Sequence, residues 1–154
     1  CAVSAFDPWV DEAAIRAEGV EPMPLDDLLQ NDVISIHTPL TEETRGLIGA
    51  AELAQMPAHA IIVNCSRGGI VDEAALAAAL SAQTIAGAGL DVFEAEPPAR
   101  ANPLFGLPNI LLSPHVAGVT ENGMKDMALN VADVVDAIHR GERPATLLNP
   151  EIFA

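Results

Sequence analysis

The 154-residue chain predicts an α/β fold in which helices wind onto both faces of a parallel sheet. Short apolar runs of strand length alternate with stretches of helical pattern, as in successive βαβ units. The expected strands are apolar at successive positions, which a sheet covered on both faces requires. Half of the residues are hydrophobic and only 3% are aromatic, so alanine and small aliphatic side chains are expected to fill the core.

The expected elements follow one another without an internal repeat. Strands are predicted over residues 2–6, 20–21, 32–37, 60–65, 84–92 and 110–113. Helices are predicted over residues 9–18, 25–31, 50–56, 73–82 and 120–140, and residues 93–109 form a proline-rich loop.

The helix at residues 120–140 shows the clearest periodicity. Apolar side chains recur every 3.6 residues, and Gly141 ends the pattern. Met124 and Met127 belong to this stripe, where methionine is expected as a core filler rather than as part of a functional site. The following segment contains Pro144 and Pro150 and is expected to dock on another part of the protein.

Charge and cysteine content exclude several classes of protein. The 7 basic and 22 acidic residues give a formal net charge of −15, which disfavours nucleic acids and anionic membranes as partners. No apolar run approaches the roughly 18 residues of a membrane span. Cys1 and Cys65 are not in a CxxC motif, so no zinc site is indicated. A soluble, cytoplasmic protein without a bound metal is expected.

Polar side chains stand at the carboxyl ends of the predicted strands. Ligands of open parallel sheets bind outside this edge, so the sequence predicts a site there. The side chains at these ends are Asp7, His37, Thr38, Cys65, Ser66, Arg67, Asp91, Glu94, Glu96, Ser113 and His115.

Each of these residues also has a plain structural interpretation. Asp7 can bind the ribose hydroxyls of NAD and disfavour the extra phosphate of NADP, or it can simply form an Asp-Pro turn. Arg67 carries a planar fork that matches a carboxylate, and Gly68 and Gly69 allow a sharp turn and close approach, yet a surface arginine fits equally well.

His115 and Glu96 form the expected acid–base pair. A histidine exchanges protons near neutral pH, and a neighbouring carboxylate stabilises its charged form. A single histidine or loop glutamate is more often structural. The functional interpretation therefore depends on Arg67, Glu96 and His115 sharing one edge of the sheet.

Four motifs in this order resemble one known family: "HTPLTEETRGLI", "NCSRGGIVDEAAL", "GAGLDVFEAEP" and "LLSPHVAG". They are similar to the D-isomer-specific 2-hydroxyacid dehydrogenases, and the resemblance extends from about Asp7 to the end of the chain. It implies a Rossmann-type fold, NAD as cofactor, a small 2-hydroxy or 2-oxo acid as substrate and a homodimeric full-length protein. Glutamate at position 96 sets aside the formate dehydrogenase branch, and "HVAGVT" slightly favours the glyoxylate/hydroxypyruvate group over the phosphoglycerate group.

The resemblance also implies a role for each site residue. Arg67 would bind the substrate carboxylate, His115 would be the general acid/base, and Glu96 would hold and tune the histidine. The cofactor would be contacted by Asp7, Thr38, Cys65, Ser66, Arg67, Asp91, His115, Ala117 and Gly118.

The sequence departs from the family at its start. The fingerprint G-x-G-x-x-G lies about 20 residues before the ribose-binding acid, which places it upstream of Cys1. Residues 1–140 are therefore expected to be the C-terminal portion of a nucleotide-binding domain that is incomplete at its N-terminal side. Residues 141–154 are expected to be a tail that returns to an absent substrate domain. By itself the chain is expected to bind cofactor weakly and to be inactive.

Two other functions compete with this interpretation. A non-enzymatic, corepressor-like member of the same family would bind NAD and protein partners, and it could keep Arg67, Glu96 and His115. A metal hydrolase using the four histidines (His37, His59, His115 and His139) lacks ligand spacing such as HExxH.

Overall fold

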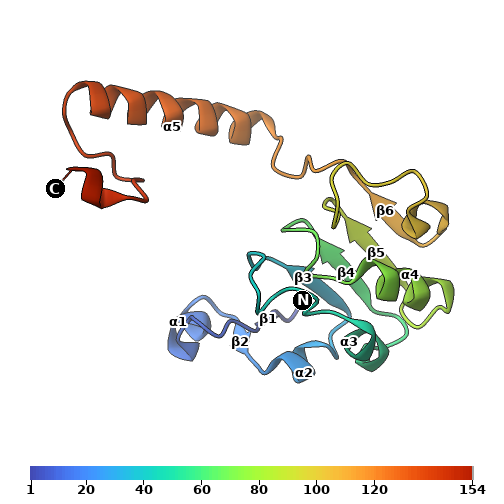
Figure 1. Ribbon diagram of the computed structural model, residues 1–154. Helices are drawn as coiled ribbons and strands as arrows, with labels where there is room; N and C mark the ends of the chain where they lie inside the picture. Colours follow the sequence, from blue (N-terminus) through green and yellow to red (C-terminus); the bar gives the residue numbers. More distant parts are fainter. Residues whose placement is uncertain (154) are drawn as a thin grey trace. The chain divides into compact units, whose positions relative to one another are not determined.

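Four parallel strands form the main sheet of the structure, a computed structural model that describes residues 1–153 (Figure 1). Its strands, in spatial order, are β3 (Val33–Ile36), β4 (Ile61–Asn64), β5 (Gly87–Leu90) and β6 (Ile110–Leu112). All three strand pairs are parallel, with Val33 opposite Ile61. The predicted α/β class with a parallel sheet is confirmed.

A second, two-stranded parallel sheet lies at the start of the chain. It pairs β1 (Ser4–Ala5) with β2 (Glu21–Pro22) and is not joined to the four-stranded sheet. The strand β3 consequently has a neighbour on one side only, β4.

The helices of the first part of the chain are short. They are α1 (Glu12–Ala17), α2 (Leu25–Leu28), α3 (Ala50–Gln55), α4 (Glu73–Ser81) and the 3-10 helix η1 (Pro103–Gly106).

Two predicted elements begin later in the structure for local reasons, and one further element was not predicted. The first helix begins at Glu12 rather than at residue 9 because the Asp11 carboxylate accepts the Ala13 N–H at 2.9 Å and caps it. The strand predicted from residue 84 begins at Gly87, after a turn in which Gln83 has a φ of 56°. The helix η1 was not predicted, and the Asn102 side chain caps it within the proline-rich loop.

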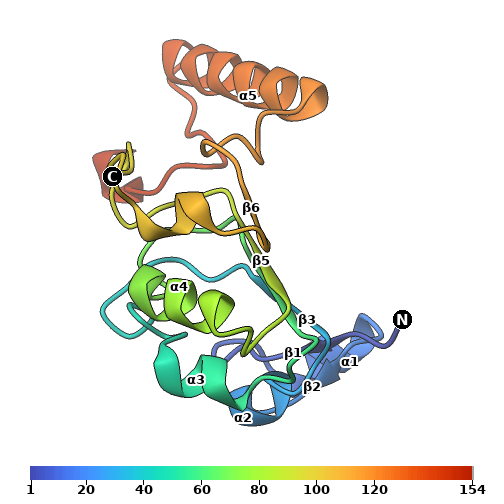
Figure 2. The ribbon, with the colours of Figure 1, turned by 90° about the vertical axis from the view of Figure 1, so that its right-hand side faces the viewer.

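Helices cover one face of the main sheet. Side chains on that face, such as Ile34, Ile62 and Leu90, are at most 5% exposed, and α3 and α4 lie side by side over it (Figure 2). The opposite face carries Val33 and Leu111, which are 59% and 81% exposed. Within residues 1–115, the buried face of the main sheet is therefore the one that α3 and α4 cover.

The described chain divides into two compact units. The first comprises Cys1–His115, and the second begins at Val116. The predicted boundary after residue 140, between a nucleotide-binding domain and its tail, stays a prediction. Ala154, at the end of that tail, lies outside the described residues.

The second unit contains the long helix α5 (Glu121–His139), which confirms the predicted helix, and the 3-10 helix η2 (Pro150–Phe153). The Thr120 hydroxyl caps α5 by accepting the Gly123 N–H at 3.0 Å. Met124 and Met127 are 50% and 54% exposed, so their prediction as core fillers is wrong for the described residues. The side chains of α5 are exposed or half-buried, and none is buried. No helix within residues 1–153 combines the length and apolar character needed to cross a membrane.

Candidate active site

The carboxyl ends of β3 to β6 bring most of the predicted site residues to one edge of the main sheet. The strand order places the segments after β4, β5 and β6 beside one another. The Ser66 hydroxyl donates to the Thr38 carbonyl and joins the segments after β3 and β4. Residues gathered at this edge are Thr38, Cys65, Ser66, Arg67, Asp91, Glu96 and His115.

Asn64 shapes the turn that presents Arg67. This asparagine is 2% exposed at the end of β4, where its Oδ1 accepts the Ser66 N–H at 3.0 Å and its Nδ2 donates to the Arg67 carbonyl at 2.9 Å. The Arg67 side chain is exposed, and its Nη1 donates to the Ser66 carbonyl at 2.7 Å. Sequence analysis missed Asn64, although an asparagine at a strand end commonly makes such a turn.

Gly68 allows the loop after β4 to contact the loop after β5. A Cβ atom at this position would lie 1.8 Å from the Phe93 carbonyl oxygen and 2.1 Å from its carbonyl carbon. Only glycine permits two backbones to come this close. The Arg67 loop and the Glu96 loop are thereby packed against each other.

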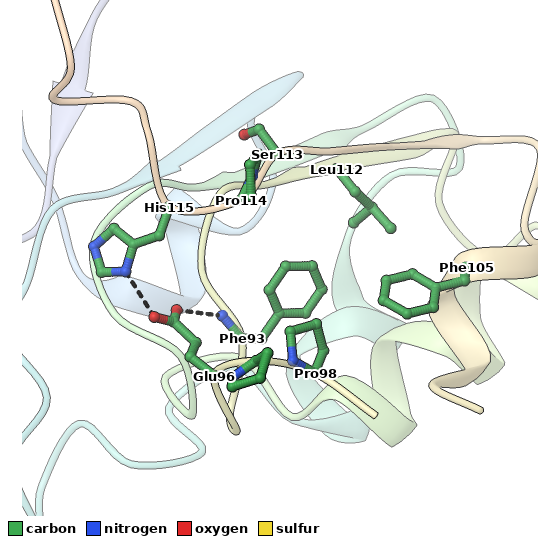
Figure 3. A pocket seen from close by; sticks show the side chains of 9 residues that line it. Phe93, Glu96, Pro98, Phe105, Leu112, Ser113, Pro114 and His115 are labelled. Carbon is green, nitrogen blue, oxygen red and sulfur yellow. Dashed lines mark hydrogen bonds and ion pairs between the residues drawn. The ribbon is translucent and has the colours of Figure 1, made fainter. Parts of the chain in front are cut away.

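Glu96 and His115 form the predicted pair (Figure 3). His115 Nδ1 lies 2.8 Å from Glu96 Oε2, and Glu96 Oε1 accepts the Phe93 N–H at 3.0 Å. Because an ionised carboxylate only accepts hydrogen bonds, Nδ1 carries the proton of this contact and Nε2 is left for a substrate. The His115 side chain is 49% exposed and the Glu96 side chain 38%.

Two hydrogen bonds lower the pKa of Glu96 below its ordinary value of 4.5. The contact with His115 has the larger effect, and the bond from the Phe93 N–H has the smaller one. The Glu96 carboxylate is therefore ionised at neutral pH. Because this pKa is lower in the folded state, the ionised Glu96 carboxylate stabilises the fold above pH 4.5. That contribution is lost as the pH falls through the folded-state pKa.

His115 is held in an uncommon backbone conformation. Its φ is 56°, in the left-handed region that non-glycine residues seldom adopt. The His115 N–H donates to the Asp91 carbonyl at 2.7 Å, and the Ser113 hydroxyl donates to Asp91 Oδ1 at 2.6 Å. Asp91 is 2% exposed, so the histidine is tied to the sheet interior through this buried acid.

A cavity of about 350 Å³ adjoins the pair. It is mainly apolar, and the rings of Phe93 and Phe105 meet edge to face with centroids 6.0 Å apart (Figure 3). Sequence analysis missed this cavity, because most of its lining residues come from the segments between β5 and β6 and just after β6, which show no periodic pattern. The remaining side chains around it are Pro97, Pro98, Leu112, Ser113 and Pro114.

Three predicted residues are not gathered at this edge. Asp7 follows β1 of the smaller sheet, and its Oδ1 accepts the Trp9 N–H at 2.9 Å, which matches the simple Asp-Pro turn. Ala117 and Gly118 belong to the second unit, so their contact with the cofactor stays a prediction.

The histidines do not gather into a metal centre. His59 precedes β4 at the opposite edge of the sheet and contacts Asp32 at 2.7 Å, whereas His37 contacts Ser35 at 2.8 Å. Among residues 1–153, no group of three or more His, Cys, Asp or Glu side chains could hold a metal ion.

The chain is similar in sequence and structure to several known proteins. Residues 1–117 match the family described as D-isomer specific 2-hydroxyacid dehydrogenase, NAD binding domain. A glyoxylate reductase from Korarchaeum cryptofilum is 48% identical over 135 residues, which cover 87% of this chain and 41% of that protein. A D-3-phosphoglycerate dehydrogenase from Archaeoglobus fulgidus is 41% identical over 140 residues, which cover 90% of this chain and 27% of that protein.

A similar solved structure is D-lactate dehydrogenase with NAD+ from Lactobacillus jensenii, with a TM-score of 0.87 and 31% identity. The match covers 96% of this chain and 48% of that one. The chain thus spans less than half the length of each of these relatives. It belongs to the D-isomer-specific 2-hydroxyacid dehydrogenases, a family of NAD-dependent oxidoreductases, and matches their NAD-binding domain.

Proposed function

We propose that this chain carries the catalytic pair of an enzyme that interconverts a small D-2-hydroxy acid and its 2-oxo acid. The observation that carries the proposal is the 2.8 Å contact between Glu96 and His115 at the carboxyl edge of the sheet. The exposed Arg67 stands at the end of β4 on the same edge. A charged fork and a paired histidine are what binding and protonating a 2-oxo acid require.

The roles follow from the chemistry of the side chains. Arg67 binds the substrate carboxylate with two parallel hydrogen bonds. His115 donates a proton from Nε2 to the keto oxygen during reduction and takes it back during oxidation. Glu96 stabilises the charged imidazole and holds its ring through Nδ1. NAD supplies or accepts the hydride when it is bound.

The residues present fit one half of NAD. Polar groups after β3, β4 and β5 line the edge beside His115, where the nicotinamide would lie against Thr38, Cys65, Ser66 and Asp91. Asp7 would bind the adenosine ribose from the smaller sheet. No glycine-rich G-x-G-x-x-G segment for the pyrophosphate occurs within residues 1–154.

We propose further that residues 1–140 are the C-terminal portion of a nucleotide-binding domain, followed by a tail that returns to a substrate domain. The proposal is supported by the short share of each relative that the chain spans and by the division of the strands into two sheets. An additional parallel strand could pair with the vacant side of β3. The homodimeric state stays a prediction of the family resemblance, and the cytoplasmic location stays a prediction of the sequence composition.

Among substrates, the proposal favours glyoxylate or hydroxypyruvate over phosphoglycerate. It is supported by the "HVAGVT" segment and by the similarity to a glyoxylate reductase. The corepressor-like alternative could keep the same pair, so the Glu96–His115 contact does not separate it from the enzyme, and turnover must decide between them.

The direct test is an assay of a longer protein that contains residues 1–154. With NADH, we expect reduction of glyoxylate and hydroxypyruvate to exceed that of pyruvate, and oxidation to be limited to D-isomers. Fluorescence of NADH reports the rate. Absence of turnover with every 2-oxo acid, alongside intact NADH binding, would favour the corepressor-like alternative.

The isolated chain should bind NADH weakly, because the segment that holds the pyrophosphate is missing from it. We expect the change in Trp9 fluorescence not to saturate as NADH is added up to millimolar concentration. This tryptophan is 82% exposed and two residues from Asp7. Saturable binding at micromolar NADH would contradict the proposal that the chain lacks half of its cofactor site.

A further inference from the structure

The loop that carries Glu96 has few anchors of its own. Between Glu94 and Arg100 it is exposed apart from the half-buried Pro98, and it contains no helix or strand. A segment without buried apolar anchors moves readily unless hydrogen bonds hold its ends. The position of Glu96, which must meet His115 at 2.8 Å, therefore depends on what fixes this loop.

Glu73 binds both ends of the loop. Its Oε1 accepts the Glu94 N–H at 2.5 Å, and its Oε2 accepts a hydrogen bond from Asn102 Nδ2 at 2.7 Å. The contact with Glu94 is reciprocal, since Glu94 Oε1 accepts the Glu73 N–H at 3.0 Å. Asn102 in turn caps η1, because its Oδ1 accepts the Leu104 N–H at 3.0 Å.

The helix that carries Glu73 is anchored in the core. Glu73 is the first residue of α4, and Leu76 and Leu80 of that helix are at most 1% exposed in the core. Its carboxylate is not needed to cap the helix, because the Asp72 carboxylate already accepts the Ala75 N–H at 2.8 Å. Both oxygens of Glu73 point to the loop instead.

We propose that Glu73 is a positioning residue of the active site, which fixes the Glu96 loop at Glu94 and Asn102 and so sets Glu96 against His115. The inference rests on the proposed function for its catalytic consequence. Its structural part does not, since the contact between Glu96 and His115 exists in the chain whatever the chain catalyses.

The test is a nuclear magnetic resonance titration of the Glu96 carboxyl carbon in the 154-residue chain. The contacts with His115 and Phe93 lower the pKa of Glu96, and the nearby Asp91 charge opposes them. In Glu73→Ala the loop is released, and the pKa of Glu96 is expected to rise towards its ordinary value. Glu73→Gln keeps an acceptor for the Glu94 N–H but turns an amide towards Asn102, so an intermediate pKa is expected.

Glu52→Ala is the matched control. Glu52 also lies in the first turn of a helix, α3, and accepts a backbone N–H, that of Gly49 at 2.9 Å. If Glu73→Ala only destabilised its own helix, Glu52→Ala would lower stability in a similar way, and neither variant would change the pKa of Glu96. An unchanged pKa of Glu96 in folded Glu73→Ala would overturn the inference, and Glu73→Gln decides in the same way if the alanine variant does not fold.

Kinetics of a longer protein that contains residues 1–154 separate this inference from the proposed function. There, Glu73→Ala is expected to lower kcat about tenfold with KM nearly unchanged and to move the acid limb of the pH–rate profile, since the pair that handles the proton is loosened. If the wild-type protein shows no turnover, the proposed function fails, whereas the titration still tests the positioning role of Glu73.

Discussion

In a longer protein with the proposed activity, replacement of His115 by alanine should lower kcat by about 10²- to 10⁴-fold, the usual contribution of a general acid/base. The keto oxygen then has no donor at the position of Nε2, and Glu96 loses the imidazole that it contacts at 2.8 Å. The affinity for NADH should change little, because the histidine acts on the substrate oxygen and the remaining residues of the edge are untouched. Steady-state kinetics and an NADH titration of the same preparation measure both quantities.

His59→Ala provides the control for this experiment. His59 is also an exposed histidine paired with a carboxylate, Asp32 at 2.7 Å, but it precedes β4 at the opposite edge of the sheet. We expect its replacement to leave kcat within about twofold, because surface substitutions away from a site have small effects. Normal turnover in His115→Ala would remove the histidine from the mechanism.

Gly68→Ala should destabilise the fold by about 3 kcal/mol, at the upper end of overpacking effects. The new Cβ would fall 1.8 Å from the Phe93 carbonyl oxygen and 2.7 Å from the Glu94 nitrogen. These are backbone atoms, so no change of a side-chain rotamer relieves the contact. The loops of Arg67 and Glu96 must move apart, and activity should fall together with stability.

Urea unfolding of the 154-residue chain, followed by circular dichroism, measures this effect without any assay of activity. Gly106→Ala is the matched control, since a Cβ atom there would meet nothing within 4 Å. Its free energy of unfolding should stay within about 0.5 kcal/mol of the wild type. Equal stability of the two variants would show that the two loops are not packed as the structure describes.

The alternation of apolar runs and helical stretches was sufficient to predict the parallel sheet and the order of its elements. Their ends were less predictable. The first helix begins at Glu12, and β5 at Gly87, because Asp11 and the turn at Gln83 satisfy backbone groups locally. A periodic pattern does not record such side-chain and turn contacts.

The residues of the site were also largely predictable, since a chain that alternates strand and helix must bring the strand ends to one edge. Arg67 and His115 could be read in this way, and Glu96 followed as the partner of the histidine. Asn64 and Glu73 could not. A polar residue at a strand end or in the first turn of a helix has the same appearance whether it caps its own segment or holds a distant loop.

What the sequence by itself determined is therefore the fold class, the family and the set of candidate side chains for the site, because these depend on local patterns and motifs. The tertiary structure alone decided that Gly68 lies against Phe93, that Glu73 fixes the loop of Glu96, and that Asp91 holds His115 with a φ of 56°. Each of these contacts joins residues more than 20 positions apart in the chain, as 68 to 93, 73 to 94 and 91 to 115. Such contacts form only when the strands have paired and the loops after them come within hydrogen-bonding distance.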